Sequence, residues 1–361
     1  MTGPRPDDEQ NMTSSPQAAQ AAVPDALATR GGSAGQFIDA SGAERVSVII
    51  PAYNVAPYIA ETLKSVFAQT KSAFEVIVVN DGSPDTAELE EVLRPFRDRI
   101  VYLKQENRGL SGARNTGIRA ATGDLIALLD GDDLWMPRYL ETQTQFLRSH
   151  PEYDLVYCNA RFFGDSAYEG RQFMEVCPSR GEVTPAAIIS RKCCVFVSVT
   201  ARAEALRELG FDESLRSCED FDCWLRLTSS GRRIGYHRKI LVQSRKRDES
   251  LSADPMWMAE WHLKVLKKAS AHWAKESNEA SLLERAIAQK TAELAILRGT
   301  QRLRTGDVNS AVVEFTEAKR FHGSVKITAL ILLLRLAPGL MRWLFRLRGI
   351  LLPRNKESTT R

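Results

Sequence analysis

Polar clusters stand directly after three of the apolar runs in this 361-residue sequence. Pro51–Asn54 (PAYN) follows the first run, Asn80–Ser83 (NDGS) the second and Asp130–Asp133 (DGDD) the last. An Asp at such a position can accept the N–H of a uracil-like ring. Two Asp residues separated by one residue can hold a hard divalent cation, to which a diphosphate supplies further oxygen ligands. Each cluster alone is ordinary turn chemistry, but together they fit a single ligand.

The elements that must position these clusters are strands and helices in alternation. Apolar, β-branched runs predict strands at residues 46–50, 74–79, 100–103 and 125–129, and helical spacing predicts helices at 58–69 and 111–121. Near-continuous apolar strands separated by helices imply a parallel sheet that is covered on both faces. The fold class is therefore α/β, and ligands are expected at the carboxyl ends of the strands, where all three clusters lie.

A further polar segment, ENRGLSGARN at residues 106–115, precedes the second predicted helix. It matches neither the GxGxxG pattern of dinucleotide-binding folds nor the phosphate loop of nucleoside triphosphatases. Ser111 can cap the following helix, and Gly109 lets the backbone approach a ligand closely. A plain helix entry with a solvated Arg114 is the alternative interpretation.

Taken in order, PAYN, NDGS, ENRGLSGARNTG and LLDGDD within residues 46–133 resemble the motifs of family 2 glycosyltransferases. The similarity continues through CEDFDCWLR at 218–226 and covers about residues 45–252. This resemblance implies a GT-A fold, with a Rossmann-like, mostly parallel sheet flanked by helices. It also implies transfer of a sugar from a nucleotide-diphosphate donor, usually UDP-linked, to an acceptor hydroxyl with inversion of configuration.

The resemblance also assigns roles to individual residues. Asp81 would hold the base, Asp130 the ribose side, and Asp132 together with Asp130 a Mg²⁺ or Mn²⁺ ion that bridges the diphosphate. Asp220 would be the general base, with Glu219 as the alternative, or the pair could only favour a helix dipole. The expected donor-binding residues are Pro51, Ala52, Tyr53, Asp81, Asn107, Gly109, Arg114, Asp130, Gly131 and Arg247.

Two departures from the family pattern refine this expectation. The QxxRW motif of processive synthases is absent, which favours a single transfer over polymer extrusion. Arg245-Lys246-Arg247 stands where many relatives carry a His, so Arg247 is the expected diphosphate contact. Two alternatives stay open: a nucleotidyltransferase, although the first strand is followed by no basic Gly-rich loop, and a non-catalytic scaffold that binds protein partners.

The remainder of the chain divides into three parts. Residues 1–44 are poor in aromatic residues and rich in Ala, Ser, Gln, Gly and Pro, which predicts disorder. Residues 253–322 form a helical extension in which 292–304 and 308–319 resemble one tetratricopeptide hairpin, expected to pack on the catalytic domain. Residues 323–361 are a basic tail that carries eight Lys or Arg and one Glu, or +7.

Charge and cysteine content bound the partners and the compartment. The net charge of the whole chain is only +4, so no nucleic-acid partner is expected. The six cysteines match no zinc or disulfide spacing and follow no apolar leader, which predicts reduced, structural thiols in the cytoplasm.

The tail predicts peripheral contact with an anionic membrane. Six of its leucines are spaced to line a helical face that arginines flank: Leu330, Leu333, Leu334, Leu340, Leu344 and Leu347. Its longest apolar run falls far short of the roughly 20 residues of a spanning helix, and Pro338-Gly339 should break it. A helical pair packed on the hairpin is the alternative. Membrane contact would bring the enzyme to a glycan or lipid-linked acceptor in cell-envelope polysaccharide synthesis.

Overall fold

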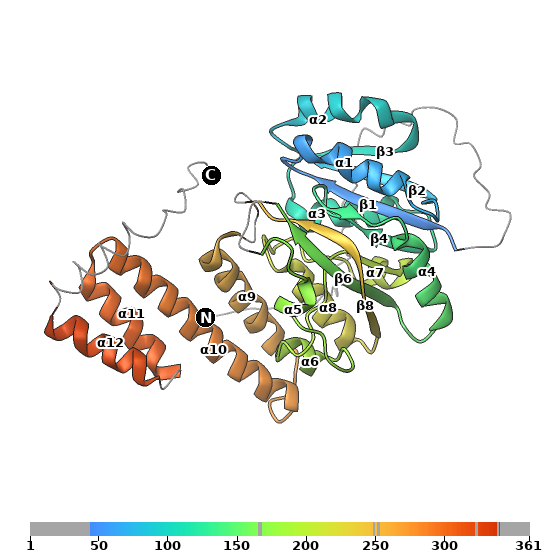
Figure 1. The fold of residues 1–361 in the computed structure, drawn as a ribbon. Helices are drawn as coiled ribbons and strands as arrows, with labels where there is room; N and C mark the ends of the chain where they lie inside the picture. Colours follow the sequence, from blue (N-terminus) through green and yellow to red (C-terminus); the bar gives the residue numbers. More distant parts are fainter. Residues whose placement is uncertain are drawn as a thin grey trace, which may run out of the picture.

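The computed structural model describes residues 44–164, 168–247, 250, 253–321, 324–337 and 339. Residues 1–43 of the segment predicted to be disordered lie outside the described residues, as does most of the basic tail. The centre of the molecule is an eight-stranded sheet in the order β3-β2-β1-β4-β7-β6-β8-β5 (Figure 1). Its strands are β1 Val46–Ala52, β2 Glu75–Asp81, β3 Val101–Gln105, β4 Leu125–Leu128, β5 Leu134–Trp135, β6 Leu155–Phe163, β7 Val199–Arg202 and β8 Ile234–Arg245.

Most strands of the sheet share one direction. β1 pairs in parallel with β2 and β4, β2 with β3, and β6 with β8, whereas β7 is antiparallel to both β4 and β6 and β5 to β8. Six strands therefore run one way, and only β5 and β7 oppose them. The prediction of an α/β fold with a mostly parallel sheet is confirmed.

Helices flank the sheet and separate its strands. They are α1 Ala56–Phe67, α2 Thr86–Leu93, a 3₁₀ helix Arg94–Arg99, α3 Gly109–Ala120, α4 Tyr139–Ser149, α5 Phe173–Val176, α6 Pro185–Ile189, α7 Ala203–Leu209 and α8 Glu219–Ser229. The four predicted strands and two predicted helices of residues 46–129 all occur, with ends shifted by a few residues. Gly117 lets α3 lie directly on β1, since a Cβ there would stand 2.3 Å from Cγ2 of Ile49.

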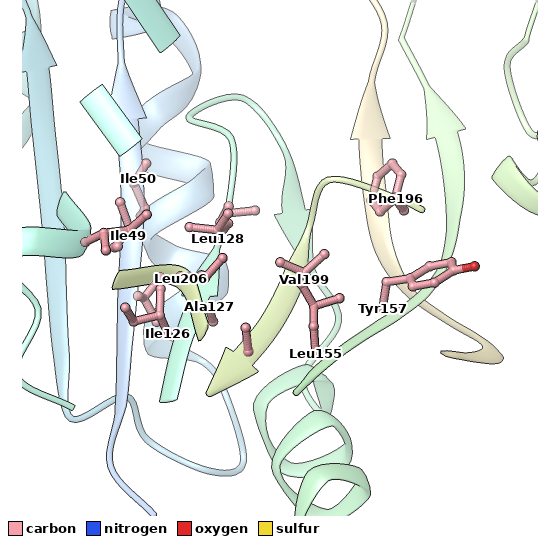
Figure 2. Close-up of a cluster of buried hydrophobic side chains, with 14 of the residues drawn as sticks. Ile49, Ile50, Ile126, Ala127, Leu128, Leu155, Tyr157, Phe196, Val199 and Leu206 are labelled. Carbon is pink, nitrogen blue, oxygen red and sulfur yellow. The ribbon is translucent and has the colours of Figure 1, made fainter. Parts of the chain in front are cut away.

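The core lies on both sides of the junction between β4 and β7. Every residue of β1 and β4 is buried, as continuous apolar strands in a covered sheet must be. Figure 2 shows how Ile49 and Ile50 of β1, Leu128 of β4, Val199 of β7 and Leu155 of β6 follow one another across the sheet. One hydrophobic cluster thus joins the parallel half of the sheet to the mixed half.

Four helices follow the sheet domain: α9 Pro255–Ser270, α10 Asn278–Arg304, α11 Val308–Phe321 and α12 Val325–Leu336. α10 is 27 residues long and begins well before residue 292, where the sequence predicted the first hairpin helix. Leu266 of α9 and Leu283 of α10 belong to the core of the sheet domain. The hairpin of α10 and α11 therefore lies at the far end of α10, and α12 packs beside α11 (Figure 1).

The first part of the basic tail is the helix α12. It ends at Leu336, two residues before Pro338, where the sequence predicts a break. Leu334 and the partly buried Leu330 pack into a cluster with α10 and α11, whereas Leu333 is half exposed. Leu340, Leu344 and Leu347, the remainder of the predicted apolar face, lie outside the described residues.

Candidate active site

One cavity of about 1190 Å³ opens at the carboxyl ends of β1, β2 and β4 and the first turns of α3 and α8. It brings together residues that lie up to 211 positions apart in the chain, from Pro51 to His262. All of the expected catalytic, donor-binding and metal-binding residues line it: Pro51, Ala52, Tyr53, Asp81, Asn107, Gly109, Arg114, Asp130, Gly131, Asp132, Glu219, Asp220 and Arg247.

Asp81, the last residue of β2, is nearly buried at one end of this cavity. Its Oδ1 accepts hydrogen bonds from the Gln105 side chain at 2.7 Å and from the backbone N–H of Arg108 at 2.9 Å. Burial raises the pKa of Asp81, and the hydrogen bond from the Arg108 backbone opposes that rise. The following Gly82 has φ of +62°, and a Cβ there would stand 2.7 Å from the Asn107 nitrogen. The lack of a side chain at Gly82 therefore lets the turn lie directly against the loop that carries Asn107.

Arg114 lies in α3 with its side chain only 1% exposed, so it is not the solvated residue that the alternative interpretation supposed. Its Nη1 donates to Oε1 of Glu219 at 2.6 Å, and its Nη2 donates to Oδ1 of Asp130 at 2.8 Å. Burial alone would lower the pKa of Arg114, but the charges of Asp130 and Glu219 outweigh burial and raise it. The guanidinium therefore stays charged and fixes two carboxylates of the cavity.

Asp132 faces a different cation. Nε of Arg247 lies 2.8 Å from Oδ2 of Asp132 in an ion pair without hydrogen-bond alignment. Burial raises the pKa of Asp132, the Arg247 charge opposes that rise, and the Asp130 charge adds to it. Arg245 donates through its backbone N–H to Oδ1 of the buried Asp133 at 2.7 Å. Asp133 and Arg245 line the same cavity, although the sequence analysis gave neither residue a role of its own.

The residues that follow β4 fit a divalent cation whose coordination is completed by the oxygens of a bound phosphate. Among the described residues no three His, Cys, Asp or Glu side chains are arranged around one metal position. Asp130 and Asp132 both face the cavity, however, and a carboxylate as buried as Asp132 attracts a positive charge, which Arg247 supplies here. Hard cations accept two carboxylates when substrate oxygens complete their coordination.

Glu219 and Asp220 are neighbours at the start of α8, but their surroundings differ. Glu219 is buried in its ion pair with Arg114. Asp220 forms no ion pair within the described part of the chain, and its Oδ1 accepts only the backbone N–H of Phe221 at 2.7 Å. Burial and the charge of Glu219 raise the pKa of Asp220 to about 7, against the opposing charge of Arg114. One carboxylate is thus held in place while the other is poised to exchange a proton near neutral pH.

Backbone conformation singles out the same cavity. Three residues other than glycine have a left-handed φ in the described ranges: Asn54 at 54°, Arg191 at 56° and Cys218 at 57°. All three line the cavity, and Cys218 is the N-cap of α8 directly before Glu219. Such conformations persist where the surrounding structure enforces them, and they concentrate at functional sites.

The side of the cavity away from Asp81 is largely apolar. Its wall includes aromatic side chains from β6, α5, α8, α9 and the loop before β7, namely Phe162, Phe173, Phe196, Phe221 and Trp257. This wall could not be predicted from the sequence, because its members come from separate elements without a shared motif. Trp135, two residues after Asp133, is no part of this wall: it is buried, stacks on Tyr139 with ring centroids 4.0 Å apart and donates to Ser198.

The sequence of the sheet domain matches a known family of proteins. Residues 47–198 match the family model described as "Glycosyl transferase family 2". Residues 47–198 thus belong to glycosyltransferase family 2. One curated relative is an uncharacterized glycosyltransferase of Rickettsia bellii, which is 30% identical over 70% of this chain and 34% of the relative. Another is the minor teichoic acid biosynthesis protein GgaB of Bacillus subtilis, which is 31% identical over 57% of this chain and 23% of the relative. The chain spans about a third of the length of the first curated relatives that it matches.

Two solved glycosyltransferase structures share the GT-A fold with this chain. One is mannosyltransferase PcManGT from Pyrobaculum calidifontis in complex with GDP-Man and Mn²⁺, with a TM-score of 0.56 and 21% identity over 86% of this chain and 87% of that one. The other is S. aureus TarS 1–349 in complex with UDP-GlcNAc, with a TM-score of 0.54 and 21% identity over 77% and 82%. The prediction of a GT-A fold in family 2 is confirmed.

Proposed function

We propose that the protein transfers one sugar from a nucleotide-diphosphate donor, UDP-linked in the first instance, to an acceptor hydroxyl with inversion of configuration. The observation that carries this proposal is the division of roles within the Glu219-Asp220 pair. Arg114 holds Glu219, while Asp220 faces the same cavity as Asp81 and Asp132 without an ion pair in the described residues. A cavity with separate places for a nucleotide and for a proton acceptor suits glycosyl transfer.

The proposed general base is Asp220. A hydroxyl is a poor nucleophile, so a carboxylate must take its proton as it attacks the anomeric carbon. A pKa of about 7 suits this task, since a base works best when its pKa lies near the working pH. Attack from the side opposite the leaving diphosphate gives inversion in a single displacement. Glu219 is disfavoured as the base because its carboxylate already accepts from Arg114 at 2.6 Å.

The remaining polar residues would bind and orient the donor. Asp81, held by Gln105 and Arg108, would accept the N–H of the base, and Asp130, fixed by Arg114, would face the ribose. Asp130 and Asp132 would hold Mg²⁺ or Mn²⁺, which when bound supplies Lewis-acid stabilisation of the departing diphosphate. Arg247 would turn from Asp132 to the phosphates, which offer it a bidentate partner.

The proposed acceptor is a glycan or lipid-linked glycan of the cell envelope. Cell-envelope glycan synthesis is supported by the relative GgaB, which is named as a minor teichoic acid biosynthesis protein. None of the described helices has the length and apolar character needed to span a bilayer. We propose that the basic tail docks the protein on the cytoplasmic face, because α12 exposes Val325, Leu332, Leu333 and Leu336 and is followed in the sequence by the arginine-rich residues 342–348.

Donor binding can be tested before the acceptor is known. A thermal-shift panel of UDP- and GDP-sugars, each with and without Mn²⁺, measures which ligand binds the native state, since binding raises stability by RT ln(1 + [L]/Kd). We expect a UDP-sugar to raise Tm, and Mn²⁺ to increase that shift. Absence of a shift with any nucleotide sugar would favour the scaffold alternative. A shift with nucleoside triphosphates alone would favour a nucleotidyltransferase.

A further inference from the structure

Two of the six cysteines differ from the others in their surroundings. Cys158, Cys193, Cys218 and Cys223 are buried, as expected of structural thiols. Cys177 and Cys194 are partly accessible and lie in the wall of the cavity on its apolar side. Neither has a part in the proposed glycosyl transfer.

The backbone brings these two cysteines together. Cys177 is the C-cap of α5, and Cys194 lies in the segment before β7. Ser179 and Cys193 form an isolated antiparallel bridge, and the backbone N–H of Cys194 donates to the carbonyl of Pro178 at 3.0 Å. Residues 177–179 and 193–194 therefore run side by side. The two side chains are close enough that the Cys194 thiol lowers the pKa of Cys177.

Arg191 joins the pair from the same loop. Its Nη2 lies 3.9 Å from Sγ of Cys177, and its carbonyl oxygen accepts from the Cys194 thiol at 4.0 Å. Arg191 is one of the residues held at a left-handed φ, so the loop is bent to present both its side chain and its carbonyl to the pair. A guanidinium beside a thiol stabilises the thiolate, which is the reactive form of cysteine.

The interaction between the two sulfurs shifts their pKa values in opposite directions. The neighbouring Cys194 thiol, together with the charges of Arg191 and Lys246, lowers the pKa of Cys177 to about 6 against the effect of burial. The neighbouring Cys177, burial and the nearby Cys193 raise the pKa of Cys194, against the charge of Arg191. An ionised thiol beside a protonated one is the arrangement of an attacking and a resolving cysteine.

We propose that Cys177 and Cys194 form a reversible, peroxide-sensitive disulfide pair in the wall of the cavity. The Cys177 thiolate attacks one oxygen of hydrogen peroxide, the O–O bond breaks, and the released hydroxide takes up a proton to give water. Cys177 is then a sulfenic acid. The Cys194 sulfur attacks it, the S–S bond forms, and the hydroxyl leaves as water with the thiol proton. The two sulfurs together lose two electrons, which the peroxide gains, and thiol exchange restores the reduced pair.

Oxidation would alter the cavity at a defined place. The disulfide would tie the end of α5 to the loop before β7, between Val176 and Val195, both of which line the cavity. Arg191 would lose its thiolate partner and present an unpaired charge to that wall. The proposal itself concerns only the two sulfurs, so it stands or falls separately from the glycosyl-transfer reaction.

The test is peroxide treatment of the full chain followed by intact mass measurement and peptide mapping. We expect a loss of two hydrogen atoms that dithiothreitol reverses, and a linked peptide containing Cys177 and Cys194. In Cys194→Ser the reaction should stop at the sulfenic acid, trapped by dimedone on Cys177. Cys177→Ser should show neither product, whereas Cys193→Ser, which changes the buried neighbour, should still form the link.

A second measurement covers the case in which a variant folds poorly. In the unmodified protein, alkylation of Cys177 by iodoacetamide should reach half its maximal rate near pH 6, and Arg191→Gln should move that midpoint upward. The proposal is overturned if peroxide yields no Cys177–Cys194 link, if dimedone labels the other cysteines of Cys194→Ser as strongly, or if Cys177 titrates like an ordinary thiol.

Discussion

Arg114 organises the site although arginine is rarely buried. Its two ion pairs place Asp130 at the end of β4 and Glu219 at the start of α8 on either side of one guanidinium. Nε of Arg114 is buried without a hydrogen-bond partner within the described structure, so the geometry favours the carboxylates over full satisfaction of the donor. The position of Asp220 follows from that of Glu219, because the two are adjacent in the first turn of α8.

Replacing Arg114 should cost stability as well as donor binding. Arg114→Met leaves Glu219 buried beside Asp130 without a counter-charge, and loss of one partner of a buried pair costs about 3–5 kcal/mol. The matched control is Arg138→Met, which removes the exposed ion pair with Glu141. Chemical denaturation should show a large loss for Arg114→Met and little change for Arg138→Met. Equal losses in the two variants would contradict the role assigned to Arg114.

The raised pKa of Asp220 makes a prediction about pH. The carboxylate is the active form of a base, so transfer should be fast above about pH 7 and fall as Asp220 becomes protonated below it. An Asp with an ordinary pKa would stay ionised throughout that range. The kcat profile across one pH unit on either side of the pKa measures this, and a flat profile would exclude Asp220 as the titrating base.

The effect of a divalent metal on sugar transfer should require the Asp132 carboxylate. Asp132→Ala removes one of the two carboxylates that face the cavity at the end of β4, so transfer should be nearly abolished. The stabilisation that Mn²⁺ adds to donor binding in a thermal shift should also disappear. Arg247 loses its ion-pair partner in the same variant, and Arg247→Gln separates that effect. Wild-type activity that persists in excess EDTA would show that the metal proposal is wrong.

The four strands and two of the helices of residues 46–129 could be predicted because the strands are buried on both faces and these helices have clear apolar spacing, whereas α2 and the 3₁₀ helix after it were not predicted. Later elements gave weaker signals. β8 has an exposed middle at Arg238 and Lys239 between buried stretches, and β7 has only four residues. The shared location of the site residues was predictable because the motifs follow parallel strands. The burial of Arg114, the Cys177–Cys194 contact and the aromatic wall were not, since each depends on elements distant in sequence.

The contact between α10 and α11 depends on a glycine. A Cβ at Gly299 would stand 2.9 Å from Cζ of Phe315, so Gly299→Val should overpack the hairpin and cost about 1–3 kcal/mol. Gln301→Val, at an exposed position of the same helix, carries only the helix-propensity cost. Thermal unfolding should separate the two variants. Donor binding should be unchanged in both, because the hairpin does not line the cavity, and a Gly299→Val variant as stable as Gln301→Val would contradict this packing.

The whole molecule combines a sheet domain with a helical arm, formed by α9 to α12, and a basic tail whose first part is α12. α12 buries Ile327, Ile331 and Leu334 against the arm, so a cut at residue 322 would expose that cluster as well as remove the tail. A chain ending at Ala337 keeps α12 and loses residues 338–361. Full-length protein should co-sediment with anionic liposomes at low salt, since each basic residue near the surface adds roughly 1 kcal/mol, and the shortened chain should not. Equal sedimentation would exclude the tail as the membrane contact.

Asp220 is proposed to remove the proton from the acceptor hydroxyl, and the variant Asp220→Asn tests this role. The measurement is the release of nucleoside diphosphate from the donor that binds, with donor affinity measured on the same protein. Asn keeps the size of the side chain but cannot accept the proton, so kcat should fall about 10²–10⁴-fold while donor Kd stays unchanged. Glu219→Gln should instead weaken donor binding, through the loss of its charge on Arg114. Near-normal turnover in Asp220→Asn would contradict the account.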